Sequence, residues 1–208
     1  MRLTVVGCAG SYPGPDSAAS AYLVQADDEA GRTWSILLDL GNGAFGPLQK
    51  YVEPLDIDAV ALTHLHADHY FDMAAMYVYC RYHPDRSEFD EAPVPVFCPF
   101  GTASRLADAY GTDIGELSTE FTFTTWQAGT AIRVGPLVVE PQAVEHSIPA
   151  YGFRISGPSE ADPGKTVSLA YSGDTDLCPN LVYLAQDVEL LLAEATFVSH
   201  PALPTGIH

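Results

Sequence analysis

The run Thr63-His64-Leu65-His66-Ala67-Asp68-His69 places four potential metal ligands within six residues. His64 and His66 alternate at the end of an expected strand, so both side chains point the same way. Asp68 and His69 follow in the turn that opens a helix. Imidazole suits zinc and other first-row metals, and a carboxylate adds an oxygen ligand that also admits manganese. A single histidine is usually structural, but this density of ligands predicts a metal site.

Short apolar segments rich in Val, Ile, Leu, Phe and Tyr surround this run, and each is ended by turn residues, which predicts strands. They cover 3–6, 21–25, 35–40, 59–63, 94–98, 121–125, 137–139, 152–155, 167–172 and 188–193. Helical length and pattern occur at 45–52, 69–82, 102–110 and 180–185, and loop composition at 7–20, 83–93 and 157–165. Strand mostly follows strand in each half, which favours two sheets sandwiched by helices over an alternating doubly wound sheet.

Composition and charge restrict the function. The chain has 208 residues, of which 47% are hydrophobic and 17% charged, as expected for one folded domain. Asp and Glu total 27 against nine Lys and Arg, giving a net charge of −18. Binding of a long nucleic acid is therefore disfavoured, because Lys and Arg supply most of such affinity. A small anionic substrate is still expected, since bound divalent cations can attract it.

The four cysteines, Cys8, Cys80, Cys98 and Cys178, are far apart and form no Cys-x-x-Cys pair. They indicate neither a zinc ribbon nor a redox motif, and we predict buried thiols. The N-terminal apolar run reaches Gly and Pro too soon for a signal-peptide core, and no apolar stretch is long enough to cross a bilayer. We expect a cytoplasmic protein with no membrane partner, and a homodimer stays open.

The run 63–69 matches the His-x-His-x-Asp-His signature of the metallo-β-lactamase superfamily, and the chain resembles its ribonuclease Z-like and cyclic-nucleotide phosphodiesterase branches. The resemblance covers nearly the whole chain through further motifs at 6–11, 37–41, 144–147, 171–175 and 194–197. It implies a fold of the α/β (α+β) class, the αββα four-layer sandwich. It also implies two divalent metal ions, for which zinc is the first expectation and manganese the second.

Carried over position by position, the resemblance implies two sets of metal ligands that share Asp174. They are His64, His66 and His146 for one metal, and Asp68 and His69 for the other. Two such cations can share a water and lower its pKa, so the implied nucleophile is a metal-bridging hydroxide. Taken alone, His146 is equally well explained as a surface histidine, and Asp174 as a turn-forming aspartate after Gly173.

Three other residues have supporting or catalytic positions in the resembling families. Asp39 ends a buried-looking strand, where an aspartate is often only a turn cap, and the resemblance implies that it orients a ligand histidine. Glu194 closes an apolar strand, where an unpaired carboxylate would be costly. The resemblance pairs it with a downstream histidine that contacts phosphate or protonates the leaving group, here His208. The expected catalytic residues are thus Asp68, Asp174, Glu194 and His208.

Members of these families continue past the position of His208 through another helix and strand to a last histidine. We therefore expect 1–208 to be a single domain that lacks its final helix and strand. The implied function is di-metal hydrolysis of a small phosphodiester such as a cyclic nucleotide.

Three alternatives to this function stay open. The first is a ribonuclease Z-like tRNA 3′ endonuclease, for which the chain shows no basic arm. The second is a thioester or lactone hydrolase of the same fold. The third is a metal-binding remnant without turnover. A secreted β-lactamase is disfavoured, because the chain lacks the cysteine ligand at the matching position.

Overall fold

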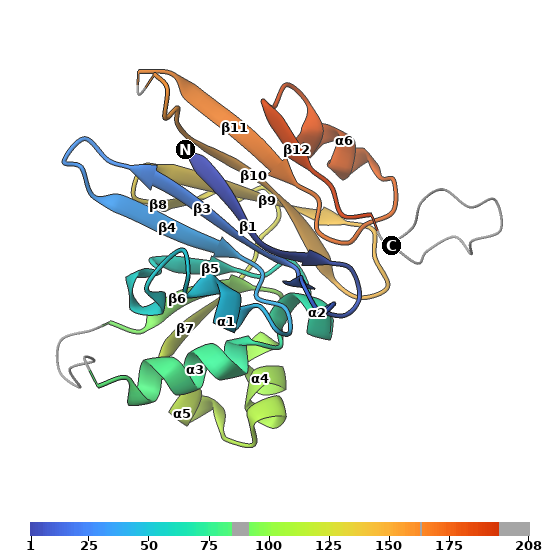
Figure 1. The fold of residues 1–208 in the computed structure, drawn as a ribbon. Coiled ribbons are helices and arrows are strands. Elements are labelled where there is room, and N and C mark those ends of the chain that lie inside the picture. The colour runs from blue at the N-terminus through green and yellow to red at the C-terminus, as the bar shows by residue number, and fades with distance from the viewer. Residues whose placement is uncertain (85–91, 163, 196–208) are drawn as a thin grey trace.

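The computed structural model describes residues 1–84, 92–162 and 164–195, which form two mixed β-sheets packed face to face, with helices on both outer faces (Figure 1). The layer order is helix, sheet, sheet, helix. The αββα sandwich predicted from the sequence is therefore confirmed.

The first sheet has seven strands and carries the N-terminal half of the chain. In spatial order they are β2 (Ala18–Ala19), β1 (Arg2–Ala9), β3 (Ala21–Asp27), β4 (Thr33–Leu38), β5 (Ala59–Ala61), β6 (Val94–Cys98) and β7 (Phe121–Thr125). β3 is antiparallel to both β1 and β4, and β4 to β7 are parallel. The carboxyl ends of β1 and of β4 to β7 consequently meet at one edge of the sheet.

The second sheet has five strands. In spatial order they are β12 (Leu190–Leu192), β11 (Thr166–Tyr171), β10 (Ala150–Pro158), β9 (Leu137–Val144) and β8 (Ile132–Val134). Neighbours are antiparallel except β11 and β12. The carboxyl ends of β9, β11 and β12 therefore share an edge. A hydrogen bond from Tyr151 N to Thr63 O, 3.0 Å long, ties this edge to the loop that follows β5.

Helices cover the outer face of each sheet (Figure 1). The seven-stranded sheet carries α1 (Phe45–Leu48), η1 (Pro54–Asp56), α2 (Ala67–Tyr70), α3 (Met73–Tyr82), α4 (Thr102–Tyr110) and α5 (Ile114–Leu117). The five-stranded sheet carries α6 (Pro179–Ala185), which packs on β9, β10 and β11. No helix in these described ranges is long and apolar enough to cross a membrane.

Alternation along the strands of the first sheet creates two separate hydrophobic cores. On β3 and β4, Leu23 and Leu37 face the helices, where Met76 of α3 and Leu106 of α4 join them. The intervening residues of the same strands face the second sheet and meet its inner side chains. This second core includes Val24, Ile36 and Leu38 from the first sheet and Phe153, Ile155 and Tyr171 from the second. The first sheet is thus buried on both faces, which explains why its strands have few polar residues.

Some local predictions were wrong. The predicted helix over 69–82 is divided into α2 and α3, because Leu40 donates to His69 O and accepts from Asp72 N, at 2.8 and 3.1 Å. These two hydrogen bonds to Leu40 take the place of hydrogen bonds that a continuous helix would make between its own residues. The predicted loop over 7–20 contains the end of β1 and all of β2, and β8 and α5 were not predicted. Cys8 is exposed, whereas the other three cysteines are buried as predicted.

Candidate metal centre

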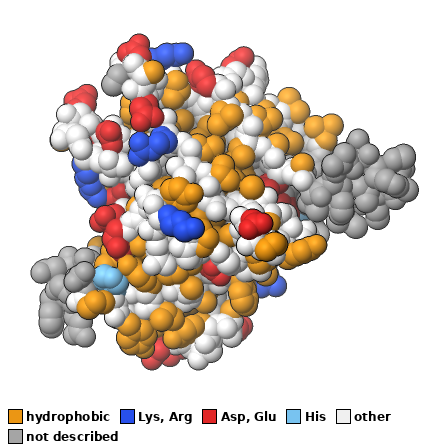
Figure 2. Space-filling view, viewed as in Figure 1, with side chains coloured by type: hydrophobic (Ala, Val, Ile, Leu, Met, Phe, Trp, Pro, Cys, Tyr) orange, Lys and Arg blue, Asp and Glu red, His pale blue; other side chains and the backbone are white. Residues whose placement is uncertain are grey.

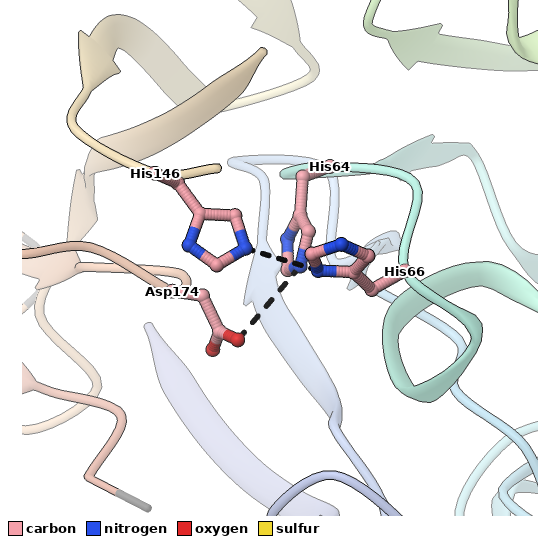
Figure 3. Close-up of side chains that lie close together, drawn as sticks. All are labelled: His64, His66, His146 and Asp174. Carbon is pink, nitrogen blue, oxygen red and sulfur yellow. Dashed lines mark hydrogen bonds and ion pairs between the residues drawn. The ribbon is translucent and has the colours of Figure 1, made fainter. Parts of the chain in front are cut away.

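The predicted ligands meet at the edge where the carboxyl ends of the two sheets face each other. His64 and His66 lie in the loop after β5, His146 follows β9 and Asp174 follows β11, and their polar atoms point toward one another (Figure 3). Two groups of ligands form, and each offers atoms that all lie within 4.8 Å of one another. The first is His64, His66, His146 and Asp174, and the second is Asp68, His69 and Asp174.

Asp174 connects the two groups, because its two carboxylate oxygens face different histidines. Its Oδ2 lies 3.8 Å from His64 Nε2, and its Oδ1 lies 3.3 Å from His69 Nε2. In the second group, Asp68 Oδ2 is 3.7 Å from the same His69 nitrogen. A carboxylate whose two oxygens face histidines of different ligand groups is the arrangement that a ligand shared by two cations requires.

Hydrogen bonds determine which nitrogen of His64 faces the site. Thr63 Oγ1 donates to Asp39 Oδ2 at 2.8 Å and lies 3.0 Å from His64 Nδ1. Since the hydroxyl proton is directed to Asp39, the consistent assignment has His64 Nδ1–H donating to Thr63. The lone pair of His64 Nε2 is then directed into the site, in the tautomer that binds metal.

Asp39 orients the second group in the same way. Its carboxylate is fully buried and accepts from Thr63 N at 2.7 Å and from His69 Nδ1 at 2.8 Å. His69 Nε2 is thereby directed toward Asp68 and Asp174. Asp39 itself has a φ of 55°, in the left-handed region that aspartate tolerates better than most residues. This bend turns the chain directly after β4.

Two glycines allow the close backbone approaches that form the site. A Cβ on Gly41 would lie 1.9 Å from the carbonyl oxygen of Asp68, so a side chain there would displace the ligand loop. Gly173 precedes the shared ligand, has a φ of 56° and packs against Thr63, whose Cβ would be 3.0 Å from a Cβ on this glycine.

A backbone group also orients Asp68. Ser11 N donates to Asp68 Oδ2 at 3.0 Å.

Glu194 lies near the site but contacts hydroxyl groups. Its Oε1 accepts from Ser20, Tyr22 and Tyr171, each at 2.9 Å. The family resemblance pairs Glu194 with His208, which lies outside the described residues. The hydroxyl contacts were not predicted, because Ser20 falls in a predicted loop, Tyr22 and Tyr171 fall in predicted strands, and no motif connects them.

Comparison with known proteins identifies the family of the chain. A model described as "Beta-lactamase superfamily domain" matches residues 34–204.

The chain belongs to the beta-lactamase superfamily.

Three relatives illustrate this membership. An uncharacterized protein of Mycobacterium tuberculosis is 39% identical over 211 residues, covering 100% of this chain and 72% of the relative. Ribonuclease Z of Anoxybacillus flavithermus is 26% identical over 247 residues, covering 97% and 77%. The crystal structure of the metallo-beta-lactamase fold protein YhfI of Bacillus subtilis has a TM-score of 0.73 at 23% identity, covering 91% of this chain and 69% of that chain. YhfI is also named "Probable metallo-hydrolase".

The chain is thus a hydrolase of the metallo-β-lactamase fold with a candidate metal site, and its own atoms fit divalent cations. His64 Nε2 is buried and has no hydrogen-bond partner, which is costly unless a cation satisfies it. His66 Nδ1 and His146 Nε2 face each other at 3.0 Å, so both could direct a lone pair to one metal ion. The donor set of imidazoles and carboxylates suits zinc and manganese alike.

The electrostatics also favour a cation. Burial and the neighbouring His69 lower the pKa of His64 to about 2. Burial opposes ionisation of Asp174, but the hydrogen bond and charge of His69 lower its pKa to about 2. Burial likewise opposes protonation of His69, yet the charge of Asp39 and the hydrogen bond to Asp174 raise its pKa well above the ordinary value. The carboxylates that hold a proton on His69 would hold a metal ion in its place.

We predict that the metal-free protein is most stable near pH 6.5, the unperturbed pKa of histidine. Below it, unfolded His64 takes up a proton that the folded state rejects, so stability falls as the pH falls. Above it, folded His69 keeps a proton that the unfolded state has released, so stability falls as the pH rises. Each slope approaches about 1.4 kcal/mol per pH unit.

Urea unfolding in the presence of a chelator, at intervals between about pH 5 and 8, measures this dependence. The His64→Asn variant provides the control, since it should lose the acidic slope and retain the alkaline one. Stability that rises steadily through the whole interval would contradict the prediction.

Proposed function

We propose that this chain is a di-metal phosphodiesterase acting on a small phosphodiester such as a cyclic nucleotide. The metal ligands are those of the two groups above, with zinc proposed first and manganese second. The observation that carries the proposal is the position of Asp174, whose two oxygens lie 3.8 Å from His64 Nε2 and 3.3 Å from His69 Nε2. A two-metal centre clamps the attacking and leaving oxygens of a displacement, which is the chemistry of phosphodiester hydrolysis.

The exposed fractions of the ligand side chains indicate their separate roles. His64 and His69 are 0% and 1% exposed and are fixed by Thr63 and Asp39, so they hold metal and do not exchange protons with solvent. Asp68 and Asp174 are 13% and 16% exposed. Two bound cations would lower the pKa of a shared water and stabilise negative charge on the reacting oxygens. Asp68, which is partly exposed and belongs to one ligand group only, is the carboxylate that could accept a proton there.

The charge distribution favours a small substrate over a polyanion. Arg105 donates to Leu65 O at 3.3 Å, so one guanidinium contacts the backbone of the ligand loop. Most other described cations pair with carboxylates far from it, as Arg32 does with Asp58 and Lys165 with Glu189. Figure 2 shows Lys and Arg only as scattered side chains on the face drawn. Two metal ions can attract a single phosphodiester, whereas a tRNA needs an extended basic surface.

The second candidate is tRNA 3′ processing, which the 26% identity to a ribonuclease Z favours. The net charge of −18 argues against it. Thioester and lactone hydrolysis are further candidates, because they would use the same ligands. These activities differ in substrate, so a substrate panel separates them.

The test is turnover of metal-replete protein on cyclic AMP, bis(p-nitrophenyl) phosphate, a precursor tRNA, a thioester and a lactone. We expect hydrolysis of the two small diesters, with little dependence on salt. Strong binding of precursor tRNA that weakens steeply with salt would favour the endonuclease instead. Turnover of the thioester or lactone alone would reject the phosphodiesterase proposal.

A further inference from the structure

A buried network of hydroxyl and carboxylate groups lies behind the second ligand group. Tyr171 OH is 2.8 Å from Asp39 Oδ2 and 2.9 Å from Glu194 Oε1. Ser20 and Tyr22 donate to the same Glu194 oxygen, each at 2.9 Å. The network therefore joins β11, β3 and the end of β4 to the segment after β12.

Tyr171 is the member of this network that reaches both carboxylates. Its phenol has one proton, which Asp39 and Glu194 share or receive in turn. Glu194 keeps two other donors, Ser20 and Tyr22, when the proton of Tyr171 faces Asp39. Burial and the charge of Asp39 raise the pKa of Tyr171 well above its ordinary value, so the phenol remains a donor at every working pH.

Asp39 transmits this contact to the metal ligands. The same Oδ2 atom accepts from Tyr171, from His69 Nδ1 and from Thr63 Oγ1, all at 2.8 Å. Rotation of this carboxylate would therefore turn the His69 ring away from Asp68 and Asp174. Partners that orient metal-ligating histidines usually affect metal affinity by about 10- to 100-fold.

We propose that Tyr171 is a positioning residue for the metal at Asp68, His69 and Asp174, acting by fixing the carboxylate of Asp39. The proposal depends on the two-metal site proposed above, and it is independent of the substrate. Tyr22 provides a matched contrast. It packs edge-on against Tyr171 with ring centroids 5.1 Å apart and donates to the same Glu194 oxygen, but its hydroxyl makes no hydrogen bond to Asp39.

The experiment compares Tyr171→Phe with Tyr22→Phe by zinc titration against a chelator of known affinity. Tyr171→Phe should weaken the three-ligand site of Asp68, His69 and Asp174 by about tenfold. The other site should weaken less, because Asp39 reaches His64 only through Thr63. Tyr22→Phe should leave both unchanged. Phenylalanine preserves the ring in each case, and Asp39 keeps its bonds from Thr63 and His69, so the variant chain should fold. The visible spectrum of the cobalt(II)-substituted variants provides a second readout, because it reports ligand geometry independently of turnover.

The Glu194→Gln variant tests whether the charge of Glu194, the other hydrogen-bond partner of Tyr171, contributes to zinc affinity. Glutamine retains an acceptor oxygen for the hydroxyls, so this variant should lose much less than the tenfold affinity expected for Tyr171→Phe. Equal zinc affinities in Tyr171→Phe and wild type, with two zinc ions bound to the wild type, would overturn the role of Tyr171 alone. Fewer than two zinc ions in the wild type would overturn the two-metal site itself.

Discussion

The Asp174→Ala variant is expected to lose more than about a hundredfold in kcat/KM on bis(p-nitrophenyl) phosphate. This exceeds the loss of about 10- to 100-fold that follows when a residue orienting a metal ligand is removed. The physical reason is that one side chain serves both ligand groups, with its oxygens 3.8 Å from His64 Nε2 and 3.3 Å from His69 Nε2. Alanine would remove the proposed shared ligand of the two metals and leave the two histidine nitrogens without their common anion. Steady-state kinetics and metal analysis of the same preparation measure both losses.

Asp176 provides the matched control for this experiment. It lies two residues further along the same loop, and its carboxylate accepts from Leu177 N at 2.8 Å without belonging to either ligand group. Asp176→Ala should therefore retain activity and metal content close to those of the wild type. An Asp174→Ala variant that still binds two metals and turns over normally would exclude Asp174 as the shared ligand.

The Asp39→Ala variant is expected to lose about 3–5 kcal/mol in the free energy of unfolding of the metal-free protein. This carboxylate is 0% exposed and accepts four hydrogen bonds, from Thr63 N, Thr63 Oγ1, His69 Nδ1 and Tyr171 OH. Alanine leaves Thr63 N and His69 Nδ1 buried without this acceptor, whereas Tyr171 OH can turn to Glu194 and Thr63 Oγ1 to His64 Nδ1. Denaturant unfolding at pH 6.5 measures the change.

Two further variants separate the hydrogen bonds from the backbone strain. Asn tolerates the φ of 55° at position 39 but directs an amide N–H₂ toward some of the four donors, so Asp39→Asn should also destabilise the protein. Asp187 has a φ of 54° on an exposed loop, and Asp187→Ala should cost no more than about 1 kcal/mol. Similar losses for Asp187→Ala and Asp39→Ala would mean that backbone strain, and not the carboxylate, explains the effect.

The sequence predicted those parts of the fold that depend on local patterns. The strands Val94–Cys98 and Phe121–Thr125 and the helix Thr102–Tyr110 have the predicted bounds, because apolar runs and turn residues define them directly. The helix over 69–82 could not be predicted correctly, since the break depends on hydrogen bonds from Leu40, far away in the sequence. Strands as short as β2 contain too few residues to show a period.

In the candidate site, too, the residues close together in the sequence could be predicted from local spacing, and the others could not. Four predicted ligands lie in one run, and spacing alone brings them close together. His146 and Asp174 could be placed only by resemblance, since their proximity depends on how the second sheet packs on the first. The supporting contacts of Tyr171 and Thr63 have no sequence signal, because a buried hydroxyl is defined by its partner across the core. The assignment of all these residues as metal ligands or supports stays a prediction.

Anomalous X-ray diffraction from metal-replete crystals, recorded at the absorption edge of the bound metal, tests the two-metal centre most directly. The structure predicts two anomalous peaks, one among His64, His66 and His146 and one beside Asp68 and His69, with Asp174 between them. A single peak, or peaks away from Asp174, would contradict the proposed centre.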